Sequence, residues 1–141
     1  MAETADKSLD AIIGLLADFY RLLVQGTEEP MRELFASYNE IAPLPAAGAQ
    51  SRKSALAPRL QGSLDAFVSL KNEMKKCYKQ NTLPVKLRMP MTGAHSNAVE
   101  KLSNCIDANK LLIAYLDSGD PATLAKASAL LKPMSLGKAG A

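Results

Sequence analysis

Hydrophobic residues at helical spacing occur along most of the chain and predict a series of amphipathic helices. The first is expected over about residues 6–25, where apolar positions recur three and four residues apart and so share one helix face. These positions are Leu9, Ile12, Ile13, Leu16, Phe19, Tyr20 and Leu23. Because Leu15, Leu22 and Val24 widen this face, the first helix is predicted to lie deep in the fold.

A break is predicted at residues 26–28. Gly26 stands where a helix commonly ends, because glycine tolerates the left-handed conformation of many C-terminal caps. Thr27 can cap a new helix, and Pro30 suits its first turn. The apolar spacing then continues to Pro43. Two helices meeting at residues 26–28 are therefore predicted, and the alternative is one long helix kinked before Pro30.

Two long helices are expected in the middle of the chain, over about residues 54–80 and 96–117. Residues 43–53 contain Pro, Gly and small residues without periodicity, and predict a loop. Residues 81–94 contain two prolines and a glycine, and predict a long connection. Ser96 is the expected N-cap of the second long helix.

The last helix is predicted to begin directly after Gly119. Asp120 supplies a capping carboxylate, and Pro121 occupies the first helical position. This helix is expected to stop before Pro133, which leaves residues 134–141 as a mobile C-terminal tail. Residues 1–133 are interpreted as a single domain.

The combined pattern predicts an all-α protein, an up-down bundle of about four to five helices with the two long antiparallel helices at its centre. The length of 141 residues is typical of one domain. The apolar content is mostly Ala and Leu, which are strong helix formers, and Trp is absent.

No catalytic or metal-binding motif emerges from the sequence, so a non-enzyme without a cofactor is predicted. His95 is the single histidine. A metal site needs several ligands at set spacing, so His95 is interpreted as a residue at the start of a helix that bonds to backbone. Cys77 and Cys105 lie on the two long predicted helices. A disulfide between them is one possibility, and two free thiols in a reducing cytoplasm are the preferred interpretation.

Charge is distributed unevenly along the chain, although the net charge is only +3. Residues 1–40 carry eight acidic and three basic residues, and residues 71–88 carry six basic residues and one acidic residue. We call the six cations the basic cluster: Lys71, Lys75, Lys76, Lys79, Lys86 and Arg88. It is typical of a solvated helix C-terminus. It would also fit an anionic protein or a membrane surface, whereas the scarcity of aromatic residues disfavours nucleic acid.

The predicted connection after the first long helix contains apolar residues in near alternation: Leu83, Val85, Leu87, Met89 and Met91. The preferred interpretation is that they cap the end of the core. A lid over a cavity and an extended docking segment are the alternatives, since Met adapts to irregular surfaces.

Two functions remain after these exclusions. The first is a binding or scaffold module whose helical surface engages a protein partner or a second copy, suggested by the wide apolar face of the first helix. The second is a carrier of an apolar small molecule in an interhelical cavity. No segment approaches the ~20 apolar residues of a membrane span. A cytoplasmic location is therefore predicted, although an exported protein whose signal had been removed would look the same.

Overall fold

The structure is a computed structural model that describes the backbone of residues 2–77 and 85–139. Within them, it describes the side chains of residues 9–10, 12–77, 86 and 89–133. The elements in chain order are α1 (Ala2–Tyr20), the π-helix η1 (Arg21–Gln25), α2 (Gly26–Ile41), α3 (Ala46–Gln50), α4 (Lys53–Cys77), α5 (Val85–Ser118) and α6 (Pro121–Ala139). All elements in the described ranges are helical, so the predicted all-α bundle is confirmed.

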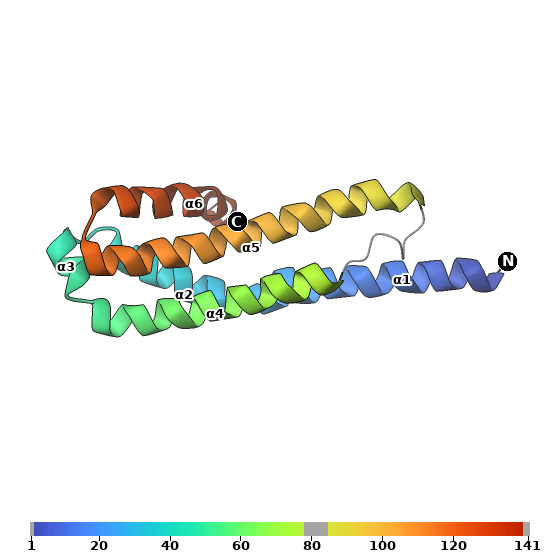
Figure 1. The fold of residues 1–141 in the computed structure, drawn as a ribbon, viewed down its shortest axis with the longest axis horizontal. Coiled ribbons are helices and arrows are strands. Elements are labelled where there is room, and N and C mark those ends of the chain that lie inside the picture. Colours follow the sequence, from blue (N-terminus) through green and yellow to red (C-terminus); the bar gives the residue numbers. More distant parts are fainter. Residues whose placement is uncertain (1, 78–84, 140–141) are drawn as a thin grey trace.

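The two long helices α4 and α5 run antiparallel at the centre of the molecule (Figure 1). The helix α2 packs on α4, and α6 packs on α5. Figure 1 also shows that α1 extends beyond the end of α4, so that the N-terminus lies at one tip of an elongated molecule. One end of the bundle therefore has four helices around a common core, whereas the other has fewer neighbours for each helix.

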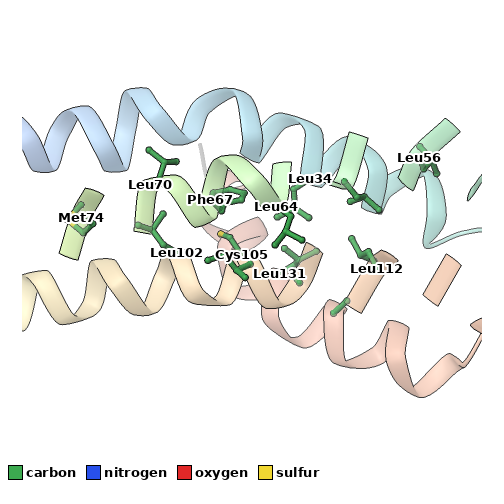
Figure 2. Close-up of a cluster of buried hydrophobic side chains, with 14 of the residues drawn as sticks. Leu34, Leu56, Leu64, Phe67, Leu70, Met74, Leu102, Cys105, Leu112 and Leu131 are labelled. Carbon is green, nitrogen blue, oxygen red and sulfur yellow. The ribbon is translucent and has the colours of Figure 1, made fainter. Parts of the chain in front are cut away.

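A continuous hydrophobic core joins these helices (Figure 2). Its fully enclosed side chains include Leu34 of α2, Phe67 and Met74 of α4, Leu112 of α5 and Leu131 of α6. Each comes from the apolar face of its own helix, and the burial of such faces is the main favourable contribution to folding.

A buried chain of hydrogen bonds sets the register of three helices. The Ser63 hydroxyl on α4 donates to the Pro30 carbonyl of α2 over 2.9 Å. From α5, the Asn109 side-chain amide donates to the Ser63 hydroxyl over 3.2 Å and to the Cys105 carbonyl over 2.9 Å. A sliding of these helices would leave buried polar groups without partners, which is costly in an apolar interior.

The predicted break at residues 26–28 is wrong, because α1, η1 and α2 follow one another without an interruption. Gly26 has right-handed angles (φ −69, ψ −28), and its N–H bonds to the Arg21 carbonyl five residues earlier. Thr27 is not a cap, since its hydroxyl donates to the Leu23 carbonyl. A Cβ on Gly26 would stand 2.7 Å from Leu70 Cδ2. Glycine therefore allows α4 to approach closely here. The helical run is continuous, as in the alternative of one long helix, and the kink before Pro30 stays a prediction.

The predicted connection over residues 81–94 is also wrong where the structure describes it. The helix α5 begins at Val85, so Pro90, Gly93 and Ser96 all lie inside it and Ser96 is not its cap. Pro90 is exposed, and water can therefore satisfy the carbonyl that its missing N–H leaves unpaired.

The prediction for α6 is confirmed at the start of the helix and wrong at its end. Gly119 adopts a left-handed φ of +68 and separates α5 from α6. Asp120 then caps α6, since its carboxylate accepts the Ala122 N–H over 3.0 Å. The helix continues through the exposed Pro133 to Ala139, past its predicted end. The predicted mobility of residues 134–141 stays a prediction.

The predicted loop over residues 43–53 contains the short helix α3. The Gln50 side-chain amide donates to the Asp117 carbonyl at the end of α5 over 2.9 Å. Because α3 also contacts α5, it closes the end of the bundle where α4 begins and α5 ends.

Candidate interaction surface

An exposed line of large apolar side chains runs along the first helix. We call it the α1 stripe, and its residues are Leu9, Ile13, Leu16, Tyr20 and Val24. Between 51% and 56% of each residue is exposed to solvent. Because successive members lie three or four residues apart, they share one face of the helix that α1 and η1 form together.

The stripe exists because the apolar part of this helix is wider than its contact with the bundle. Leu15, Phe19 and Leu22 are buried, and α1 and η1 both contact α4. Ile12 and Leu23 are half-buried at the edge of that contact. A surface helix needs an apolar arc of only about 100°. The additional arc has no covering element among the described residues, so the prediction of a deeply buried first helix is wrong.

The arrangement of these side chains matters more than their number. Single exposed apolar residues are ordinary on protein surfaces, whereas contiguous patches mark interaction sites. Burying one such side chain completely is worth about 1.5–3 kcal/mol. With about half of each residue exposed, a large part of that free energy stays available to a binding partner.

Charged residues border one side of the stripe. Asp10 and Arg21 are both exposed and lie on the same flank of the helix. The Arg21 guanidinium is 3.7 Å from the Asp18 carboxylate and 3.8 Å from Glu73 of α4. These ion pairs are exposed and weak, so Arg21 can exchange partners at little cost. On the opposite flank, the partly buried Ile12 and Leu23 pack against the core.

The basic cluster is only partly within the described residues. Lys71 is half-buried on α4, and Lys75 and Lys76 are exposed near its end. Lys86 is exposed on α5, Lys79 lies outside the described residues, and the side chain of Arg88 is not described. An anionic partner for this cluster stays a prediction.

Two glutamates of the acidic N-terminal segment form ion pairs with arginines outside the basic cluster. Glu33 of α2 pairs with Arg59 over 2.7 Å, and Glu40 pairs with Arg52 over 3.0 Å. Both arginines precede the basic cluster in the sequence. These two ion pairs therefore join the acidic N-terminal segment to the first half of α4 and to the turn before it.

The apolar residues of the predicted connection lie on both sides of the start of α5. Leu83 lies outside the described residues, and Val85 and Leu87 belong to α5 with side chains that are not described. Met89 is 85% exposed, whereas Met91 packs against the core. Since both methionines belong to a helix, the residues from Val85 onwards do not form an extended segment.

His95 bonds to backbone as predicted, but from the interior of α5 rather than from its start. Its Nε2 lies 2.8 Å from the Met74 carbonyl of α4. Its ring also faces Phe19 of α1, with ring centroids 6.1 Å apart. This residue therefore joins α1, α4 and α5 at the end of the described part of α4.

Neither Cys77 nor Cys105 is in a disulfide, and the helix register separates the two residues. Cys77 lies three residues beyond Met74, which stands beside His95, whereas Cys105 lies ten residues beyond His95. At about 1.5 Å per residue, the cysteines are roughly 15 Å or more apart along the helix axes. A disulfide needs Cα atoms within about 7 Å, so the disulfide alternative is wrong within one chain.

Burial changes the chemistry of both thiols. It raises the pKa of Cys105 to about 11, with Lys101 opposing the shift. The pKa of Cys77 is raised as well, first by its partial burial and then by the nearby Asp18 carboxylate. A higher pKa leaves less thiolate at neutral pH, which is the opposite of what an activated nucleophile requires.

A pocket of about 480 Å³ lies between α2 and α4. Glu29, Glu33 and Arg59 contribute charged groups to its wall, and Gly26 and Gly62 contribute backbone. Because half of its lining residues are exposed and three of them are charged, it is an open surface groove with a polar rim. An apolar carrier site would instead be enclosed and lined mainly by hydrophobic side chains.

Within the described ranges, no three His, Cys, Asp or Glu residues form a group that could hold a metal ion. The helices of the described part include none that is long and apolar enough to cross a membrane. Comparison of the chain with protein-family models, curated proteins and solved structures finds no match. The functional argument therefore rests on the geometry of the surface itself.

Proposed function

We propose that this protein is a non-enzymatic interaction module that binds a protein partner, or a second copy of itself, through the α1 stripe. The observation that carries the proposal is the alignment of five large apolar side chains, each more than half exposed, on one helix face. An amphipathic helix that presents an apolar face to another helix or groove is a common mode of protein recognition.

Packing against the rest of the bundle holds the helix of the α1 stripe in place. The inner side of the same helix is anchored by Leu15, Phe19 and Leu22, and Phe19 is further held against His95. A partner would therefore meet a helix that is already formed. Preformed surfaces avoid much of the ordering cost of binding.

The carrier function has less support, because the groove between α2 and α4 is open and has charged residues at its rim. We also propose that the protein acts in a reducing compartment such as the cytoplasm. The absence of a disulfide between Cys77 and Cys105 in the described structure supports this location, since extracellular proteins commonly pair their thiols.

Site-specific photocrosslinking tests the proposed surface. A benzoyl-phenylalanine at position 13, within the stripe, is expected to give covalent adducts with protein in the producing cells. The matched control carries the same group at the exposed position 69 of α4, outside the stripe, and is expected to give few adducts. Adding Leu16→Glu to the position-13 chain should remove the adducts, because a carboxylate is costly to bury in an apolar interface.

Equal adduct yields from positions 13 and 69, in chains with unchanged helical circular dichroism, would contradict the proposed function. Adducts with this chain and adducts with another protein both support an interaction module. The mass of the adduct distinguishes the two.

A further inference from the structure

We propose that the partner of the α1 stripe is a second copy of this chain, docked antiparallel about a two-fold axis near Leu16. This inference rests on the proposed function and adds to it the identity and orientation of the partner. The argument comes from the positions of the stripe residues and of the two charges beside them.

The stripe is self-complementary under an antiparallel two-fold. A two-fold interface brings the same surface of both copies together, so each residue pair occurs twice. With Leu16 on the axis, Leu16 faces its own copy. Ile13 then faces Tyr20, and Leu9 faces Val24, because these pairs are spaced almost equally about the centre. All five are exposed and available for contact.

The charges beside the stripe select the antiparallel orientation. In an antiparallel helix pair, residues on the same flank of the two helices face each other. Asp10 and Arg21 share a flank and lie at nearly equal distances on either side of Leu16. The proposed dimer therefore pairs Asp10 of each copy with Arg21 of the other. A parallel pairing would instead keep the two Asp10 residues at one level and the two Arg21 residues at another, which is less favourable.

The surroundings of the stripe leave room for a second copy. Figure 1 shows α1 at the edge of the molecule, continuing past the end of α4 toward the N-terminus. The charges near Arg21 on the same copy are Asp18 and Glu73, both with exposed side chains. These carboxylates hold Arg21 at the border of the stripe without covering the apolar residues.

Charge reversal combined with sedimentation velocity tests the inference. The full chain is expected to show a concentration-dependent dimer. Asp10→Arg and Arg21→Asp should each weaken self-association about tenfold or more, since each places like charges opposite one another twice. An equimolar mixture of the two variants should recover association, because every contact in the mixed dimer then joins opposite charges. The double variant should recover association as well.

Engineered cysteines test the register directly. In a Cys77→Ser background, Leu16→Cys is expected to form a disulfide-linked dimer with itself under mild oxidation, because position 16 lies on the axis. Leu9→Cys alone should not, whereas a mixture of Leu9→Cys with Val24→Cys should. Circular dichroism of every variant shows that the helices remain formed.

A wild-type chain that stays monomeric at all concentrations would overturn the inference. So would a mixture of charge variants that associates no better than either variant alone. If position 13 still crosslinks to another protein in either case, the proposed function stands and only the identity of the partner changes. If position 13 gives no adduct above the position-69 control, both proposals fail.

Discussion

The two ends of this molecule use the same residue types in opposite ways. At the end formed by α2, α4, α5 and α6, leucines such as Leu34, Leu60 and Leu112 are completely enclosed. On the first helix, Leu9 and Leu16 repeat the same helical spacing, yet 55% and 51% of these residues are exposed. The difference lies in the number of neighbouring helices. Periodicity tells which face of a helix is apolar, and only the packing tells whether another element covers it.

The interior of the four-helix end is also more specific than its apolar residues alone require. Ser63 and Asn109 place hydrogen-bonding groups in the core and pair them across helices. The polar contacts beside the stripe are exposed ion pairs of Arg21, which are easily exchanged. One end is thus arranged for a unique internal packing, and the other keeps a surface that is suited to an external contact.

The largest expected effect comes from a leucine-to-alanine substitution, made once at each end of the molecule. Leu112→Ala should lower the free energy of unfolding by about 2–5 kcal/mol, because it removes buried methyl groups and leaves a cavity. Leu16→Ala should lower it by less than about 1 kcal/mol in dilute solution, where the monomer prevails. Urea unfolding followed by circular dichroism measures both values. Similar losses for the two variants would show that the stripe is covered in the monomer.

The buried thiol at the four-helix end should make stability depend on alkaline pH. The pKa of Cys105 is about 11 in the folded chain and near 9.0 when it is unperturbed. The folded state then holds this proton more tightly. The contribution is complete below about pH 9 and is lost as the pH rises to about 11. Its upper limit is about 2–3 kcal/mol.

The control for this pH dependence is Cys105→Ala, which should lose less stability than the wild type between pH 9 and 11. Alkylation at pH 8 offers a second comparison. Cys77 is half-buried and Cys105 is buried, so iodoacetamide should label Cys77 first. Equal labelling rates in the folded protein would contradict the burial of Cys105.

A smaller difference in stability is expected between alanine substitutions at two glycines of the continuous helix formed by α1, η1 and α2. A Cβ on Gly26 would meet Leu70 at 2.7 Å and the Arg21 carbonyl at 3.1 Å, whereas a Cβ on Gly14 meets nothing within 4 Å. Gly14→Ala should stabilise the protein by about 0.5–1 kcal/mol through helix propensity. Gly26→Ala should instead destabilise it by about 1 kcal/mol, because Leu70 is buried with little room to move and the Arg21 carbonyl belongs to the backbone. Thermal unfolding of the two variants measures the difference.

Several features of this protein follow from sequence alone. Helical spacing and an abundance of Ala and Leu predict the all-α class, and the Gly119-Asp120-Pro121 junction predicts the start of α6, because its cap and its left-handed turn are local. The width of the apolar face on the first helix is also visible in the sequence. So is the lack of a recognisable catalytic motif.

Tertiary structure decided the rest, because each remaining feature depends on what packs nearby. In the sequence, Gly26 predicts a helix end. In the structure, Gly26 lies inside a continuous helix, where Leu70 of α4 comes close to it. Pro90 and Pro133 read as helix breakers, yet both lie on exposed helical positions where the fold continues through them. The exposure of the α1 stripe depends most on tertiary structure. Its residues would be apolar whether they were buried or exposed, and only the positions of the other helices leave them facing solvent.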